Sequence, residues 1–288
     1  MTEQELHHQR AELWRVNGNA IHTIEDAKGF LDSVGFCLMY PVRSLPMVPS
    51  FLAAFAGSSV DLPDAKHAFA DPRKQPATEL MVRLLRERQA YEINLLPESS
   101  LVVSAPLFPF LYALVGDRNP KATPKTKAQG ARLSPLALKV FESIQKRGPL
   151  SKKQLQELIS RELTGAALDR ALNELWSILK ITRVDYSEKE GASWDLLYRW
   201  SPAAVMEGSR VSAPEAISAL LGKYLEAVVA ATQEDIEQFF SHLSTRSKVR
   251  EAVHALLAGR ELDFITVGAK TLIHLAPVPE PHQRRIHG

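Results

Sequence analysis

The order of elements is clearest in residues 151–200, SKKQLQELIS RELTGAALDR ALNELWSILK ITRVDYSEKE GASWDLLYRW. Ser151 precedes one helical pattern of apolar residues, and Thr164 precedes another that runs to Ile178. Two alternating runs follow, at 180–186 and 194–200, with a polar turn between them. Together with a helix predicted over 134–147, this makes three helices and a hairpin, the order of a winged helix-turn-helix module.

The same pattern recurs 81 residues further along the chain. The shift places Ser151 on Thr232 and Thr164 on Thr245, and apolar positions such as Leu175 fall on apolar positions such as Leu256. The second copy predicts a helix over 213–229 and hairpin strands over 261–267 and 270–276. A repeat in both caps and apolar positions indicates duplicated modules.

The first part of the chain has a weaker pattern. It predicts helices beginning at Thr23 or Ile24 and ending at Ser33, over 50–56 and over 78–91, and a strand at 102–104. By analogy with the later copies, we expect a third, diverged unit here. The predicted fold class is helix-rich α+β with tandem winged helix-turn-helix domains. The expected divisions are an N-terminal region 1–116, a basic linker 117–132, a middle winged helix 133–202, a C-terminal winged helix 212–277 and a tail 278–288.

The composition is that of an ordinary globular protein. The chain has 288 residues, of which 45% are hydrophobic and 24% charged, and this length predicts about two domains or three small ones. A single cysteine, Cys37, cannot form an internal disulfide, which favours a reducing compartment. The first ten residues, MTEQELHHQR, lack the basic and apolar regions of a secretory signal. We therefore expect a cytoplasmic protein, and we expect residues 278–288 and the first residues to be frayed.

Two uncharged stretches, 44–60 and 99–116, could be mistaken for membrane spans. Both fall short of the roughly 20 apolar residues that a spanning helix needs, and both contain prolines. We expect buried core and turns here, and no membrane partner.

The charge of the chain is unevenly distributed. The net charge is only +2, yet residues 117–153 contain ten Lys or Arg and two acids, a net +8 that leaves −6 elsewhere. Residues 116–132 are rich in Lys, Pro, Thr and Gly, which is typical of an exposed linker. Lys125 and Lys127 in it either keep a connector solvated or belong to an arm that binds anions.

The third helix of each later module carries candidate nucleic-acid contacts, because this helix enters the major groove in helix-turn-helix proteins. In the last module the helix begins with Arg246, Lys248 and Arg250, although the helix macrodipole favours acids at that end. Bound phosphate groups would offset the unfavourable interaction between these cations and the helix macrodipole. The corresponding candidates in the middle module are Lys152, Lys153, Arg170, Asn173 and Lys189. Asp169 and Glu174 weaken that module's attraction for phosphate, and no set of base-reading side chains stands out.

Three short segments resemble a known family. They are Gly-Pro-Leu-Ser at 148–151, Ala-Thr-Gln-Glu-Asp-Ile at 231–236 and Gly-Phe-Cys-Leu-Met-Tyr-Pro-Val at 35–42. In this combination they resemble the bacterial winged-helix DNA-binding proteins that include the alkylpurine and interstrand-crosslink DNA glycosylases. The resemblance covers most of the chain and implies tandem winged helices around a DNA channel, with double-stranded DNA, including damaged DNA, as the partner.

The chain departs from this family at the position of its chemistry. The glycosylases carry Gln-x-Gln or Gln-x-Asp just before a proline near the start of the chain, and alignment on Pro41 places those two positions at Leu38 and Tyr40. Leu38 cannot position a water molecule or stabilise a cationic sugar, and Tyr40 is a neutral phenol at pH 7. The neighbours Cys37, Met39 and Val42 are equally poor substitutes.

Other chemistry has little support in the sequence. The nine histidines form no metal-ligand pattern, and there is no phosphate-binding loop or dinucleotide fingerprint, so we expect neither a metal nor a cofactor. Glu92 lies where the family tends to carry an acid, but a structural role is the simpler expectation. We expect core packing for the four tryptophans, Trp14, Trp176, Trp194 and Trp200.

Three functions remain open. The favoured one is a DNA-binding relative of the glycosylases without the usual catalytic pair, docked electrostatically through residues 117–153 and the Arg246 helix and recognising distorted or damaged duplexes by shape. An active glycosylase that uses other residues, with Tyr40 and Glu92 as candidates, is the first alternative. A protein-interaction scaffold is the second.

Overall fold

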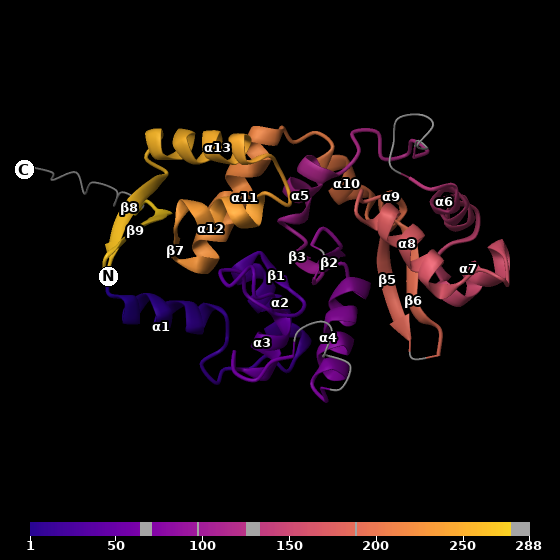
Figure 1. Ribbon diagram of the computed structural model, residues 1–288, viewed down its shortest axis with the longest axis horizontal. Helices are drawn as coiled ribbons and strands as arrows, with labels where there is room; N and C mark the ends of the chain where they lie inside the picture. Colours follow the sequence, from indigo (N-terminus) through magenta and orange to yellow (C-terminus); the bar gives the residue numbers. More distant parts are fainter. Residues whose placement is uncertain (64–70, 97, 125–132, 188, 278–288) are drawn as a thin grey trace, which may run out of the picture.

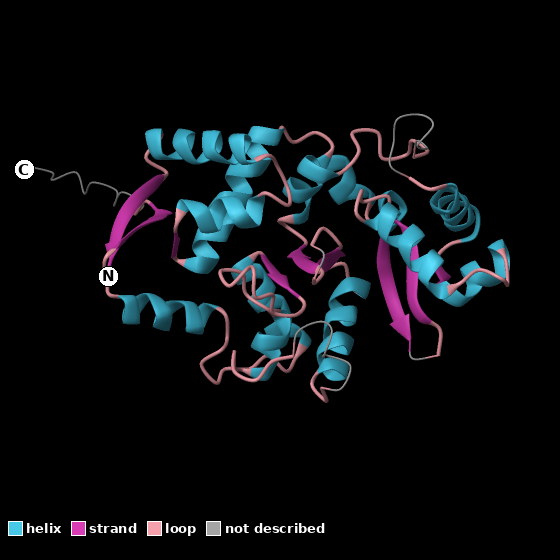
Figure 2. Cartoon of the chain, viewed as in Figure 1, coloured by secondary structure: helices cyan, strands magenta, loops and turns pink. Residues whose placement is uncertain are grey.

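The structure is a computed structural model that describes residues 1–63, 71–96, 98–124, 133–187 and 189–277. The molecule is elongated, with helices α6 (Pro135–Arg147) and α7 (Lys152–Ile159) at one end and α1 (Glu3–Leu13) with the last hairpin at the other (Figure 1). Figure 2 shows that helices dominate and that the strands form short, separate sheets.

Three units with the same element order make up most of this fold. The N-terminal unit comprises α2 (Ile24–Val34), β1 (Phe36–Leu38), α3 (Phe51–Ala56), α4 (Lys74–Arg86), β2 (Ala90–Ile93) and β3 (Leu101–Ser104). The middle unit comprises α6, β4 (Leu150–Ser151), α7, α8 (Gly165–Trp176), β5 (Ile181–Ser187) and β6 (Gly191–Leu196). The C-terminal unit comprises α11 (Ala213–Val228), β7 (Ala230–Ala231), α12 (Gln233–Phe240), α13 (Arg246–Ala258), β8 (Leu262–Val267) and β9 (Lys270–Leu275).

The three sheets share one topology. Their strand orders are β1-β3-β2, β4-β6-β5 and β7-β9-β8, and every pairing is antiparallel. In each unit, the strand that comes last in the sequence of that unit is therefore the central strand of the sheet. The predicted helix-rich α+β class is confirmed. The 81-residue repeat has a structural basis, since α7 and α12, α8 and α13, and β5 and β8 all begin at positions 81 residues apart.

The predicted helix caps explain why this repeat can be detected in the sequence. Ser151 accepts a hydrogen bond from the backbone of Gln154, whose side chain bonds back to Ser151, and Thr232 forms the same capping box with Asp235. These reciprocal bonds satisfy amides that the helix leaves unpaired. Each involves residues only three positions apart, so it depends on local sequence alone.

The expectation of a frayed N-terminus is wrong. Helix α1 begins at a capping box between Thr2 and Glu5 and lies against the C-terminal unit. Arg10 Nε donates to the carbonyl of Val228 at 2.8 Å, and Trp14 Nε1 donates to that of Ala227 at 2.7 Å. Helix α1 buries only Leu6, so it has no apolar stripe from which the sequence could have predicted it.

The helix predicted over 78–91 is also placed wrongly. Helix α4 begins at Lys74 and ends at Arg86, and Arg88 adopts a left-handed conformation with φ 55°. Tyr91 and Glu92 then lie in β2, paired with Val103 and Val102 of β3. All four residues of β2 are buried, so the strand lacks the polar alternation that would distinguish it from a helix.

A second strand boundary needs correction in the middle unit. The strand expected over 194–200 ends at Leu196, and helix α9 (Leu197–Trp200) follows, then α10 (Pro202–Gly208). Helix α5 (Phe108–Val115) occupies part of the uncharged stretch 99–116, and Phe108, Leu111 and Tyr112 from it are buried. Among the described residues, no helix is long and apolar enough to cross a bilayer.

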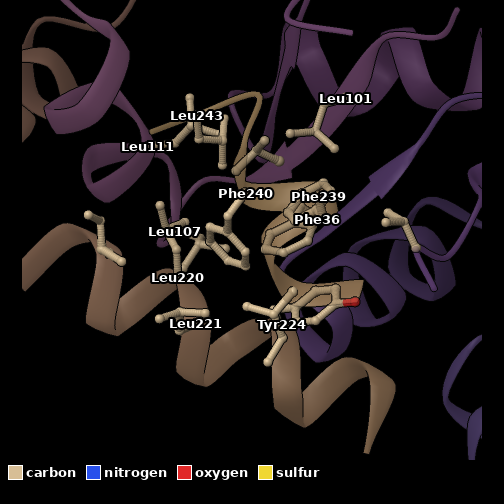
Figure 3. Packing of buried hydrophobic residues seen from close by; sticks show 14 of the residues in the cluster. Phe36, Leu101, Leu107, Leu111, Leu220, Leu221, Tyr224, Phe239, Phe240 and Leu243 are labelled. Atoms are coloured by element: carbon tan, nitrogen blue, oxygen red, sulfur yellow. The ribbon is translucent and has the colours of Figure 1, made fainter. Parts of the chain in front are cut away.

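One hydrophobic core joins the N-terminal and C-terminal units. Phe36 of β1 stacks on Phe239 of α12, with ring centroids 5.0 Å apart, and Tyr224 of α11 stacks against both rings (Figure 3). Leu220, Leu221 and Phe240 surround the stack. Because the units share this core, we expect them to unfold together rather than as independent domains.

The middle unit has a core of its own, formed by α6, α7, α8 and the β5–β6 hairpin. Trp176 and Trp194 meet there edge to face, with centroids 4.8 Å apart, which confirms the expected packing role for both. Trp200 lies partly exposed with the guanidinium of Arg88 4.9 Å above its ring. An ion pair between Arg86 of α4 and Asp185 of β5, at 2.5 Å, further links the middle unit to the N-terminal unit.

Candidate functional site

A cavity of about 940 Å³ lies between the N-terminal and middle units. Helix α4, strand β2 and the segment after β1 form one wall, and α8 with β5 forms the other. The polar side chains that matter most are those of Tyr40, Thr78, Glu92, Asn94, Asn173 and Arg183. The cavity thus contains both sequence-derived catalytic candidates, Tyr40 and Glu92.

The carboxylate of Glu92 is buried and is held by several polar contacts. Glu92 is only 3% exposed, and Ser100 Oγ donates to its Oε1 at 2.6 Å. Its Oε2 forms an ion pair with the guanidinium of Arg183. Trp176 Nε1 donates to the backbone carbonyl of Glu92 at 3.0 Å. Residues of α8, of β5 and of the turn before β3 therefore all restrain this one residue of β2.

The ion pair limits the chemistry of Glu92. A carboxylate stabilises a cationic sugar through its negative field, but the Arg183 charge lies in direct contact and opposes that field. What remains available is its capacity to accept further hydrogen bonds, because two oxygens offer about four acceptor positions.

Tyr40 contributes a neutral phenol to the cavity. Its backbone amide donates to Ser99 Oγ at 3.0 Å, which holds the segment after β1 against the turn before β3. Burial raises the pKa of the Tyr40 phenol above its ordinary value of 10, and the neighbouring Thr78 offsets only part of that effect. Tyr40 is therefore protonated at neutral pH and can donate a hydrogen bond.

Leu38, the other position aligned with the glycosylase pair, has a different environment. It lies in β1 opposite Leu101, is fully buried and belongs to the core shared with the C-terminal unit. Of the two aligned positions, only Tyr40 borders the cavity.

The cavity mouth carries an amide pair. Asn94 Nδ2 donates to Asn173 Oδ1 at 3.1 Å, linking the segment after β2 to α8. Asn173, predicted as a nucleic-acid contact, therefore borders the same cavity as Glu92. Asn94, Ser100, Trp176 and Arg183 were missed from the sequence, since nothing local signals that α8 and β5 meet the segment around β2, 79 to 91 positions away.

Several predicted phosphate contacts already have acidic partners. Lys152 pairs with Asp169 at 2.6 Å, and Lys153 lies 3.9 Å from Glu190. Arg250 pairs with Glu237 at 2.6 Å. Part of the compensation expected from phosphate at the start of α13 is thus supplied by the protein itself.

Other predicted contacts remain exposed. Arg246 and Lys248 on α13, Arg170 on α8 and Lys189 in the β5–β6 turn form no ion pair with any residue that the structure describes. Lys125 and Lys127 lie outside the described residues. The four exposed cations are the ones most readily available to an external anion.

The described part of the chain contains no cluster of three or more His, Cys, Asp or Glu that could hold a metal ion. Cys37 is fully buried, and burial raises the pKa of its thiol far above its ordinary value. It therefore packs as a small apolar residue rather than acting as a nucleophile.

Comparison with known proteins identifies the family. The family model described as DNA glycosylase AlkZ-like matches residues 61–286, and the chain belongs to the AlkZ-like DNA glycosylase family. The resemblance inferred from the three short segments is confirmed at this level. No curated protein sequence matches the chain.

A solved structure agrees with this assignment. The Streptomyces sahachiroi DNA glycosylase AlkZ superposes with a TM-score of 0.58 at 14% sequence identity, over 96% of this chain and 70% of that one. This likeness concerns the fold. The family match begins at residue 61, so the segment containing Leu38 and Tyr40 lies outside it.

Proposed function

We propose that this protein binds duplex DNA through tandem winged helices and receives an extruded nucleotide in the cavity between the N-terminal and middle units, without the excision chemistry of the usual glutamine pair. The observation that carries the proposal is a large polar cavity in an AlkZ-like chain whose aligned catalytic positions are a core leucine and a tyrosine. The shared topology of the three units supports the winged-helix assignment and the division at 117–132.

The cavity lining suits a flipped base. Proteins that extrude a nucleotide bind it by hydrogen bonds to its edge and by contact with aromatic or apolar side chains. Asn94 and Asn173 offer amide donors and acceptors, Tyr40 offers a hydroxyl, and Trp176 and Met39 offer flat or apolar surface. The lining therefore provides both kinds of contact.

Absence of excision follows from the electrostatics of Glu92. Its carboxylate is in contact with the Arg183 guanidinium, so its field at a reacting sugar is largely cancelled. In this proposal Glu92 and Arg183 line the cavity and recognise the base by hydrogen bonds. Recognition of damaged DNA then depends on how easily a duplex releases a nucleotide, because a damaged or mismatched base costs least to extrude.

Phosphate contacts are assigned to the exposed cations. Arg246, Lys248, Arg170 and Lys189 carry them, together with Lys125 and Lys127 of the linker. Lys152, Lys153 and Arg250 contribute less, because each would have to give up an acidic partner. A cytoplasmic location, where DNA is accessible, belongs to the same proposal.

The salt dependence of DNA binding tests the phosphate assignment. Each phosphate contact contributes about 0.9 to the slope of log K against log salt concentration. Arg246→Ala with Lys248→Ala should therefore lower the slope by about 1.8 on any duplex. Lys28→Ala with Arg210→Ala removes the same charge from other surfaces and should leave the slope unchanged. An unchanged slope in the first variant would remove α13 from the interface, and no binding by wild type would favour a protein-interaction scaffold.

A second candidate function, an active glycosylase, is favoured by one observation: the Glu92 carboxylate and Tyr40 line the same cavity. In that case Glu92 would accept a proton from the attacking water. A base-release assay on alkylated and crosslinked duplexes separates the two functions. Release by wild type that is lost in Glu92→Gln, with DNA binding retained, would establish excision and contradict the non-catalytic proposal.

A further inference from the structure

A second concave surface lies on the middle unit, away from the cavity between the units. It is a groove of about 290 Å³ between α6 and the last turn of α7. Figure 1 shows these two helices at the end of the molecule, beyond the β5–β6 hairpin. The residues used below are Lys139, Glu142, Lys146, Arg147, Leu158 and Ile159. We refer to this surface as the α6–α7 groove.

The groove has a surplus of unpaired positive charge. Lys139, Lys146 and Arg147 are exposed, and none forms an ion pair with another described residue. Glu142 is the one acid in the lining. By contrast, Lys152 at the start of α7 is neutralised by Asp169. The groove therefore attracts an anionic ligand.

The helix dipole explains only part of this charge. Lys146 and Arg147 lie in the last turn of α6, where cations stabilise a helix. Lys139 lies in the first half of α6, where that stabilisation is absent, since the effect is confined to the last turn. Lys139 and Lys146 nevertheless line the same groove.

An exposed apolar side chain lies among these cations. Leu158 is 39% exposed, although Leu155 on the same helix is fully buried in the core. Ile159 beside it is only partly buried. A phosphate backbone offers nothing apolar to cover Leu158, whereas a peptide offers a side chain.

We propose that the α6–α7 groove is a docking site for an acidic peptide segment of a partner protein. Its carboxylates pair with Lys139, Lys146 and Arg147, and one aromatic or aliphatic side chain covers Leu158 and Ile159. The charge of the groove selects acidic sequences, and the apolar floor adds specificity for the single large side chain. This site is separate from the nucleotide cavity and does not depend on the proposed DNA function. It reassigns Lys139, Lys146 and Arg147, which lie in the basic stretch 117–153, from the expected DNA surface to a protein partner.

Fluorescence anisotropy on the full chain tests the proposal with a labelled peptide, Asp-Asp-Asp-Asp-Phe, and duplex DNA as the second ligand. Lys139→Glu with Lys146→Glu should weaken peptide binding at least tenfold and leave DNA affinity within twofold. Arg246→Glu with Lys248→Glu makes the same change of charge on α13 and should do the reverse. Thermal melting of each variant verifies that it is folded.

A cycle at Leu158 tests the apolar contact without changing any charge. Leu158→Ser should weaken binding of the phenylalanine peptide several-fold, yet leave a peptide ending in serine unaffected. No measurable binding of the phenylalanine peptide to wild type, or equal affinities for the two peptides, would overturn the proposal. The proposal would also be overturned if Lys139→Glu with Lys146→Glu lost DNA affinity but kept peptide affinity, because the groove would then belong to the DNA surface. If wild type binds the peptide but not DNA, the proposed function fails and this inference stands.

Discussion

Arg250 donates from Nε and Nη2 to the two carboxylate oxygens of Glu237, at 2.6 and 2.7 Å, and so joins α13 to α12. This two-point pair neutralises one of the three cations at the start of α13. The charge of Arg250 is satisfied within the protein, so Arg246 and Lys248 are the cations of that segment that remain free for an external anion.

The Arg250 pair predicts a specific response to acid. Hydrogen bonds from Arg250 and Gln233 lower the pKa of Glu237 from its ordinary value of 4.5 to about 2. Because the folded-state pKa is depressed, the stabilisation is complete above about pH 4.5 and is lost as pH falls toward 2. Urea unfolding of wild type and Glu237→Gln should therefore show a difference in free energy at pH 7 that shrinks by pH 3. A difference independent of pH would contradict the assignment.

The buried pair in the cavity predicts strong coupling between two substitutions. Arg183→Met leaves the Glu92 carboxylate buried without its partner, which should cost about 3–5 kcal/mol of unfolding free energy. Adding Glu92→Gln removes the uncompensated charge, so the double variant should be more stable than Arg183→Met alone. Urea denaturation of the full cycle measures the coupling. Additive effects would show that the two side chains do not stabilise one another.

The aromatic stack between the N-terminal and C-terminal units predicts a large loss of stability when one of its rings is removed. Phe36→Ala should lower the free energy of unfolding by about 3–5 kcal/mol, because Phe36 is fully buried and packs against Phe239 and Tyr224. Phe264→Ala is the matched control, since Phe264 is 58% exposed; its effect should stay within about 0.5 kcal/mol. A single cooperative transition is expected for the N-terminal and C-terminal units. Two separate transitions in wild type would mean that this core does not couple the two units.

Lys180 predicts a local effect at the entrance of the basic linker. Its buried Nζ donates to Asp117 Oδ2 at 2.8 Å and to the carbonyls of Asn119, Pro120 and Ala122. Lys180→Met removes all four hydrogen bonds, so amide exchange in residues 117–122 should accelerate. Hydrogen-exchange mass spectrometry measures this, with Lys189→Met as a control at an exposed lysine. Unchanged exchange in Lys180→Met would show that other contacts hold the segment.

The sequence was sufficient for most elements of the two later units. Their caps at Ser151 and Thr232 and their apolar periodicity involve residues three or four positions apart, so these signals survive without knowledge of the fold. The duplicated pattern was a second local signal. Local signals are ambiguous in the fully buried β2, and for this reason the helix predicted over 78–91 runs too far.

The tertiary structure decided which candidate residues act together. Glu92 and Arg183 are 91 positions apart, and only the packing of β2 against β5 brings them into one cavity. The same applies to the charges: Lys152, Lys153 and Arg250 look like free cations in the sequence, but folding provides each with a carboxylate. Helix propensity and capping are short-range properties of the chain, whereas cavities and charge compensation arise only when distant segments meet.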